Sequence, residues 1–244
     1  MSEGNITNIV IIQKMTGEEL KIARSAHHWT QVEAAKHLGV TQAYLSMVER
    51  GSRPVSEELA ETALKVYALP PTARPMGHGK LLGGGGFQSA LGELGYPGFA
   101  YLRGGLQLNP AELLFLALDT EELDARVTEA LPWIPFQFPE MDWEWLIVEV
   151  KLRDRQNRMA FVVQLAGAVA EAEGDSSRAG SLGSKVSKLE RSRLAMEDTL
   201  CKASLSEAER RWLRSHRTKT AAHWNLLTDL KVEDLKHVYE NTSS

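Results

Sequence analysis

The segment Thr30–Gly51 (TQVEAAKHLGVTQAYLSMVERG) constrains the fold more than any other part of the chain. Thr30 and Glu33 have the spacing of a capping box, which predicts that a helix begins here. Gly39 follows the last apolar position of that helix, and glycine adopts the left-handed conformation that ends a helix at little cost. Thr41 then caps a second helix. The segment therefore predicts two short helices joined by a tight turn.

Apolar residues recur at helical spacing in this segment, and they predict which faces are buried. Val32, Ala35 and Leu38 are expected to face inward from the first helix, and Leu45 and Val48 from the second. The small side chains at positions 34 and 35 would let the two helices cross closely. The N-terminal part of the second helix is left facing outward.

The outward residues have side chains that suit DNA. In a helix-turn-helix bound in the major groove, the start of the second helix faces the base edges. Glutamine can bond to adenine through both ends of its amide, and an alanine methyl suits the thymine methyl. Gln31 would reach a phosphate or support Gln42, and arginines beside the second helix suit phosphates. We therefore predict DNA contacts from Gln31, Thr41, Gln42, Ala43, Tyr44, Ser46, Arg50 and Arg53.

From about Thr16 to Leu69 the sequence resembles the Cro/C1-type (XRE-like) helix-turn-helix family. The shared pattern is T-Q-x-x-x-A-x-x-x-G-V-T-Q-x-x-L-S-x-x-E-R-G, followed by Arg53-Pro54 and a further amphipathic helix. The resemblance implies a transcriptional regulator, of the repressor kind, that binds double-stranded DNA. A helical hairpin without a DNA role is the alternative, and it is disfavoured because Gln31 and Gln42 occupy the family's contact positions.

The predicted domain carries little net charge, since six basic residues face seven acidic ones between Thr16 and Leu69. The basic residues are Lys21, Arg24, Lys36, Arg50, Arg53 and Lys65, and the acidic ones are Glu18, Glu19, Glu33, Glu49, Glu57, Glu58 and Glu61. Because phosphate neutralisation supplies most of the non-specific affinity for DNA, one copy would bind weakly. Two copies on a palindromic site would compensate, so we expect a homodimer.

Composition excludes several other classes of protein. The chain has 244 residues, of which 43% are hydrophobic and 25% charged, as in ordinary globular proteins. Its net charge of −4 argues against a general nucleic-acid coat or a protein of the membrane surface. A single cysteine cannot form an internal disulfide, and no apolar run reaches the roughly 18 residues of a membrane span. With no basic region before an apolar core at the N-terminus, we expect a cytoplasmic protein.

Composition also divides the chain into three parts. Residues 1–69 are predicted to form the helix-turn-helix domain with an N-terminal arm, whose β-branched cluster suggests a strand, an apolar arm that packs on a partner subunit, or a floppy tail. Residues 70–86 are rich in proline and glycine, which predicts a linker. Residues 87–244 are predicted to form a larger helical domain for partner binding or dimerisation. The expected fold class is all-α, a helix-turn-helix bundle followed by this larger domain.

Caps and apolar periodicity predict the remaining helices. In the first part, Thr16–Ala26 and Ser56–Leu69 flank the central pair. In the third part, Gly174–Gly183 is expected to be a polar loop, and Ser204 and Glu207 have capping-box spacing. The helices predicted there are Phe87–Leu94, Asn109–Leu118, Asp119–Ala130, Asp142–Leu152, Asp154–Ala172, Ser184–Lys202, Ser206–Arg217, Thr220–Leu230 and Asp234–Glu240.

No motif in the chain indicates catalysis, and we expect neither an enzyme nor a bound metal or cofactor. The seven histidines show none of the usual zinc spacings, and G-x-S-x-G and S-x-x-K are missing. Cys201 lies in a predicted helix, where thiols are usually inert. GHGK within the linker lacks the hydroxyl residue that a phosphate-binding loop needs after its lysine.

Aromatic residues are concentrated around Pro139–Trp145 (PEMDWEW). One interpretation of the carboxylates in this run, with Glu149, is general acid–base catalysis. The aromatic residues favour a helical core or a partner interface instead. A partner surface is expected to use the five tryptophans of the third part, which are Trp133, Trp143, Trp145, Trp212 and Trp224. The charged run Lys151–Arg158 is expected to be a solvated helix face, with binding of an acidic partner or phosphate as the alternative.

Residues 96–171, which include NPAELLFLAL and DWEWL, are similar to helical partner domains of regulators encoded beside nucleotidyltransferase-type toxins. The later segments ERRWLR and HWNLLTDL have the same character. The resemblance implies an antitoxin that neutralises a toxin through residues 87–244 and represses its own promoter. The alternative function is an interaction or enzyme-associated protein that uses its helix-turn-helix for recruitment to DNA.

Overall fold

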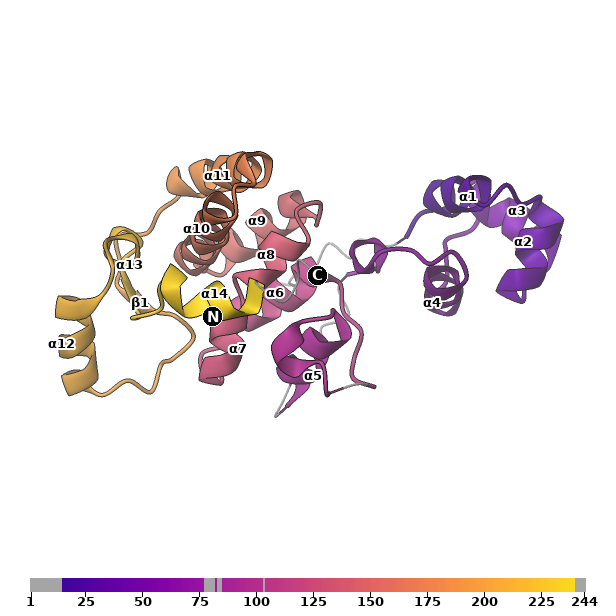
Figure 1. Ribbon diagram of the computed structural model, residues 1–244. Helices are drawn as coiled ribbons and strands as arrows, with labels where there is room; N and C mark the ends of the chain where they lie inside the picture. The colour runs from indigo at the N-terminus through magenta and orange to yellow at the C-terminus, as the bar shows by residue number, and fades with distance from the viewer. Residues whose placement is uncertain (1–14, 77–81, 83–84, 103, 240–244) are drawn as a thin grey trace, which may run out of the picture. The chain divides into compact units, whose positions relative to one another are not determined.

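The computed structural model describes residues 15–76, 82, 85–102 and 104–239, the last four by their backbone alone (Figure 1). It is mainly helical, and it divides into two compact units, 1–81 and 82–244. The N-terminal arm and most of the glycine-rich stretch of the predicted linker lie outside the described residues. Each unit is described separately below.

The first unit is a small helical bundle, and its helices lie where the sequence predicts them. Its caps are also as predicted. Thr16 and Thr30 both form complete capping boxes with the glutamate three residues later, and Gly39 ends its helix with a φ of 69°. The elements are α1 (Gly17–Ala26), α2 (Gln31–Leu38), α3 (Gln42–Glu49), α4 (Glu57–Val66) and the 3-10 helix η1 (Pro71–Ala73).

The core of the first unit is built from small and aliphatic side chains of all four helices. Leu45 and Val48 are buried from α3 as predicted. The prediction that Val32 faces inward is wrong, because this side chain is 67% exposed. On α2 the buried residues are Ala34, Ala35 and Leu38, and Val32 lies to one side of the stripe that they form.

Part of the predicted linker packs as part of the first unit. Pro71–Ala73 form η1, and Met76 is buried. The guanidinium of Arg74 forms an ion pair with Glu61 of α4. The folded segment therefore continues beyond Leu69, the predicted end of the domain.

Helices α1 and α3 approach each other so closely at Gly17 that no side chain fits there. A Cβ atom on Gly17 would lie 1.8 Å from the backbone oxygen of Val48. Since this neighbour is backbone, it cannot rotate away. Glycine at this position therefore sets the distance between the first helix and the helix predicted to read DNA.

We expect Gly17→Ala to lower the free energy of unfolding of the first unit by about 1–3 kcal/mol, the usual cost of an overpacked core. Urea denaturation of the full chain followed by circular dichroism measures this change. Gly180→Ala is the matched control, because a Cβ there meets nothing within 4 Å and Gly180 lies inside α11 (Ser176–Glu190). It should raise helix stability by about 0.5–1 kcal/mol. Equal effects of the two substitutions would contradict this view of Gly17.

In the second unit, helices surround the long helix α10 (Gln156–Ala172), most of whose residues are buried. The adjacent α11 lies beside it (Figure 1). The other elements are α5 (Gly86–Glu93), η2 (Pro97–Phe99), α6 (Pro110–Asp119), α7 (Ala125–Ala130), α8 (Trp133–Gln137), α9 (Trp143–Leu152), β1 (Asp198–Thr199), α12 (Glu207–His216), α13 (Lys219–His223), β2 (Leu226–Leu227) and α14 (Val232–Tyr239).

The prediction of a polar loop at Gly174–Gly183 is wrong, because α11 includes most of this segment. Asp175 accepts a hydrogen bond from the backbone of Arg178 and thereby caps the helix. Leu182 and Leu189 are buried, so two apolar residues seven apart hold this otherwise polar helix in place. Tertiary packing overrides the weak helix propensity of its glycines and serines.

The predicted helices Ser184–Lys202 and Thr220–Leu230 are too long. The chain leaves the helical conformation after Glu190 and again after His223, and between these points β1 pairs with β2 in parallel. Two further predictions are corrected in this region. Residues 120–124 are not helical, and the capping box is formed by Ser206 and Glu209, not by Ser204 and Glu207.

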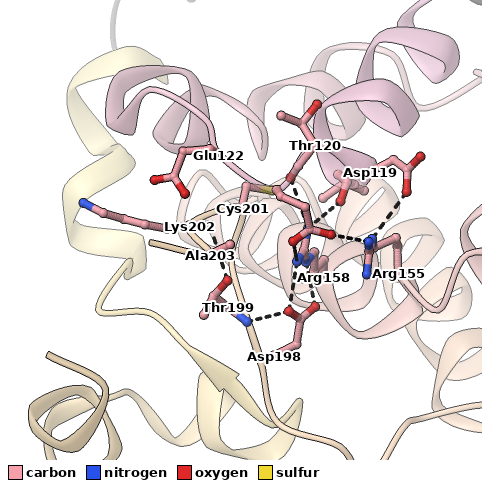
Figure 2. Close-up of polar contacts among 12 residues, drawn as sticks. Asp119, Thr120, Glu122, Arg155, Arg158, Asp198, Thr199, Cys201, Lys202 and Ala203 are labelled. Carbon is pink, nitrogen blue, oxygen red and sulfur yellow. Dashed lines mark hydrogen bonds and ion pairs between the residues drawn. The ribbon is translucent and has the colours of Figure 1, made fainter. Parts of the chain in front are cut away.

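The prediction of a solvated charged helix face at Lys151–Arg158 is wrong for its last three residues, because Gln156, Asn157 and Arg158 are buried. Arg158 has no exposed surface, and its guanidinium makes five hydrogen bonds (Figure 2). Two go to the carboxylate of Asp198, one to Glu121, and two to the backbone oxygens of Leu118 and Thr120. All five N–H donors are thereby used, so Arg158 joins α10 to the end of α6, to the following loop and to β1.

Neighbouring polar residues complete this arrangement. Buried Asn157 donates to the backbone oxygens of Leu194 and Trp224 and accepts from the backbone of Leu194. Cys201 is buried in an irregular segment, not in a helix as predicted, with a φ of 53°. Burial raises the pKa of its thiol to about 12, and its Sγ donates to the backbone oxygen of Ala117. The thiol is therefore protonated at neutral pH.

The aromatic run belongs mainly to the core of the second unit. Four of the five tryptophans predicted for a partner surface are buried, and only Trp212 is exposed among them. Trp133 packs edge-on against Tyr96 and Phe138, and Trp145 packs against Phe115. Glu149 is buried as well, and it accepts a hydrogen bond from Arg153.

Candidate DNA interface

The outward surface of α3 is formed by residues that lie within about a third of the helix circumference. Gln42, Ala43 and Arg50 are exposed, and Ser46 is half-buried between them. Thr41 precedes the helix and caps it through the backbone of Tyr44. These residues are brought together as predicted, at the start and along one side of the helix.

Tyr44 differs from the other predicted contact residues. Its side chain is half-buried and packs against the core of the first unit. Met47 lies one turn after Ala43 on the same face of the helix, and it is half-exposed. The sequence interpretation did not include Met47 among the contact residues, although its spacing from Ala43 was a usable signal.

A chain of hydrogen bonds connects Gln42 to the interior of the unit. The side-chain amide nitrogen of Gln42 donates to the amide oxygen of Gln31, at 2.9 Å. The amide nitrogen of Gln31 donates in turn to a carboxylate oxygen of Glu49, at 2.8 Å. Of the two roles predicted for Gln31, support of Gln42 is the one seen in this geometry. These two hydrogen bonds link the first residues of α2 and α3 to the last residue of α3.

Glu49 is the centre of this network, and it is only 6% exposed. Arg24 of α1 donates to both of its carboxylate oxygens, at 2.7 and 3.0 Å, and also to the backbone oxygen of Trp29. Burial alone would raise the pKa of the Glu49 carboxyl, but hydrogen bonds from Arg24 and Gln31 outweigh burial and hold this pKa below its ordinary value. The carboxylate therefore stays ionised and accepts from both partners.

Arg24 and Glu49 received no role in the sequence interpretation, although Glu49 belongs to the E-R-G that ends the motif. The two residues are 25 positions apart, so no local spacing indicates their pairing. Their charges cancel inside the unit. Arg50 and Arg53, the two arginines predicted to contact phosphates, remain exposed beside the end of α3.

The comparison with known families agrees with this geometry. Residues 17–75 match the family model described as a helix-turn-helix domain. The first unit is a helix-turn-helix DNA-binding domain. The match covers about a quarter of the chain and ends close to Met76, the last residue described in this unit. No curated protein and no solved structure matches the chain.

No helix among the residues that the structure describes is long and apolar enough to cross a membrane. Within the same residues, no group of three or more His, Cys, Asp or Glu side chains is placed to hold a metal ion.

We expect Glu49→Gln to lower the free energy of unfolding of the helix-turn-helix domain by about 3 kcal/mol at pH 7, because it leaves the half-buried guanidinium of Arg24 without its counter-charge. The folded-state pKa of Glu49 is depressed, so its contribution is present above the unfolded pKa and is lost as the pH falls through the folded pKa. The difference between the two proteins should therefore shrink below about pH 4. Urea unfolding at several pH values measures it.

The control for this substitution is Glu18→Gln. Glu18 is exposed on α1, and its ion pair with Lys21 lies at the surface. We expect this variant to change the unfolding free energy by less than about 0.5 kcal/mol. A Glu49→Gln effect that is the same at pH 3 and pH 7 would show that ionisation of Glu49 is not its source.

The hydrogen bond between Gln31 and Gln42 leads to a double-mutant test of DNA binding. Gln42→Ala should cost roughly 1–3 kcal/mol at one base position and relax discrimination there. If Gln31 acts by orienting Gln42, then Gln31→Ala should lose part of the same free energy, and it should add little in the double variant. Quantitative footprinting on the protein's own promoter measures all three variants. Fully additive losses would mean that Gln31 contacts DNA independently.

Proposed function

We propose that the chain is a sequence-specific transcriptional regulator that reads base edges through the first turns of α3 and represses its own promoter. The observation that carries this proposal is the fixed orientation of the Gln42 amide on the exposed start of that helix. Footprinting on the promoter tests it, and absence of a protected site at moderate salt would refute it. The proposed role includes no catalytic step.

The orientation of Gln42 follows from the ionised carboxylate of Glu49. A carboxylate only accepts hydrogen bonds, so Gln31 must turn its NH₂ group toward Glu49 and its carbonyl oxygen toward Gln42. Gln42 must then use one N–H to reach Gln31. Its second N–H and its carbonyl oxygen are left, and this donor and acceptor are the pair that binds the adenine edge in the major groove. The network therefore supports a preference for adenine at one position.

Phosphate contacts in this proposal come from Arg50 and Arg53. Both are exposed beside the end of α3, and the Nε of Arg50 donates to the backbone oxygen of Ser46. This bond holds the guanidinium along the helix. Such contacts set the position of the protein on the duplex without reading its sequence.

We also propose that the protein binds DNA as a homodimer, because the charge of one helix-turn-helix domain is too small for strong non-specific affinity. Two protected half-sites should lie roughly 34 Å apart along the duplex, or a multiple of this distance. Footprinting gives the spacing, and multi-angle light scattering gives the mass of the free and bound protein. A single protected half-site, with a monomer in both states, would refute the dimer.

Toxin neutralisation by residues 87–244 stays a prediction from resemblance. A partner surface in this region was predicted from its five tryptophans, and four of these lie in the core. They account for packing inside the second unit, so they give no support for a partner surface. Trp212 alone remains available, and it lies beside a cavity.

A further inference from the structure

A cavity of about 580 Å³ lies entirely within the second unit. Its walls come from α7, from the segment that leads into α12, from α12 itself, and from residues 227–230 with the start of α14. Pockets of about 300–1,000 Å³ are the usual size of small-molecule sites. The volume therefore suits a compact ligand. The DNA-binding proposal makes no use of this cavity.

Four leucines form an apolar part of the cavity lining. They are Leu200, Leu213, Leu227 and Leu230, and each of these side chains is otherwise buried in the unit. A ligand that covers these leucines gains free energy from its own apolar surface. The occupant should therefore have a bulky hydrocarbon or aromatic body.

One wall is an exposed tryptophan. Trp212 lines the cavity and is 51% exposed, whereas the other tryptophans of this unit are buried. His216 stacks on the indole, with ring centroids 4.3 Å apart and planes within 9° of parallel. This stacking holds the ring in place while half of its surface stays open. An indole face attracts cations through its quadrupole, more strongly than the other aromatic side chains do.

The charged groups of the lining are mostly negative. Four carboxylates, those of Glu129, Glu209, Asp229 and Asp234, accompany the single ammonium of Lys202. Lys202 lies near acidic neighbours, since its charge helps to lower the pKa of Glu122 and of Glu209, after the hydrogen bonds that each receives from a serine.

Two of the carboxylates are available to a ligand. Within the part of the chain that the structure describes, the side chains of Glu129 and Asp229 make no hydrogen bond or ion pair. They come from different elements, one from α7 and the other from the segment after β2. A cation in the cavity would supply the counter-charge that neither receives from the protein.

We propose that this cavity binds a small organic cation with a bulky apolar body. The leucines receive the body of the ligand, Trp212 faces its charge, and Glu129 and Asp229 supply the opposite charge. The site lies outside the helix-turn-helix domain, and binding to it is measured without DNA. Its success or failure is therefore separate from that of the proposed DNA recognition.

Tetraphenylphosphonium and tetraphenylborate test the proposal, because the two ions have nearly the same shape and opposite charge. Equilibrium dialysis against the full chain measures binding of each. We expect saturable binding of one tetraphenylphosphonium ion per chain, with tetraphenylborate at least tenfold weaker. Equal binding of the two ions would overturn the proposal, because it would indicate apolar contact alone, and so would absence of saturable binding of the cation.

Substitutions at the cavity locate the bound cation. Trp212→Ala and Glu129→Gln should each weaken tetraphenylphosphonium binding at least threefold. Both side chains are exposed, so neither change removes a core contact, and circular dichroism checks the fold. The matched control is Glu144→Gln, an exposed carboxylate on α9 that should leave binding unchanged. Equal losses in Glu129→Gln and Glu144→Gln would place the cation elsewhere and overturn the proposal.

Discussion

The arrangement of the helix-turn-helix domain depends on one buried carboxylate. Glu49 is at the end of α3, and a charged group removed from water must receive hydrogen bonds from its surroundings. It receives them from Arg24 on α1 and Gln31 on α2. One side chain thus fixes three helices relative to one another, and it holds the residue that supports Gln42. Apolar packing closes the domain, but packing alone would not specify the orientation of a surface amide.

The second unit also depends on a buried charged side chain, in this case a positive one. Arg158 is buried in α10, and its five donors join segments far apart in sequence. Replacement of such a group by well-packed apolar residues is often neutral or stabilising, so its value is not stability alone. Arg158 holds an irregular path after α6 and before α12, where few hydrogen bonds of regular secondary structure exist. These two segments also line the cavity, so the buried cation shapes the site indirectly.

Local signals in the sequence were enough to predict the helices of the first unit and some of those of the second. Capping boxes, Gly39 and apolar spacing are read within a few residues, and they gave α1 to α4 and the exposed start of α3. The errors lie where distant contacts decide the structure. The segments after Glu190 and His223 leave the helix where Asn157 and Arg158 bind them by hydrogen bonds, and no spacing shows such contacts. The pairing of Arg24 with Glu49 was invisible for the same reason.

A regulator whose DNA-binding domain is nearly neutral must obtain its selectivity for a DNA sequence from side chains that are already oriented for base contacts, more than from its charge. Phosphate attraction is the same at every site, so weak attraction lowers affinity for specific and non-specific DNA alike. What separates the two is the free energy of base contacts, and this is largest when the reading group needs no reorganisation on binding. Gln42 is held by Gln31, and Gln31 by the ionised Glu49. The same buried charge that fixes the helices thus leaves the Gln42 amide with one donor and one acceptor for the base contact that we propose.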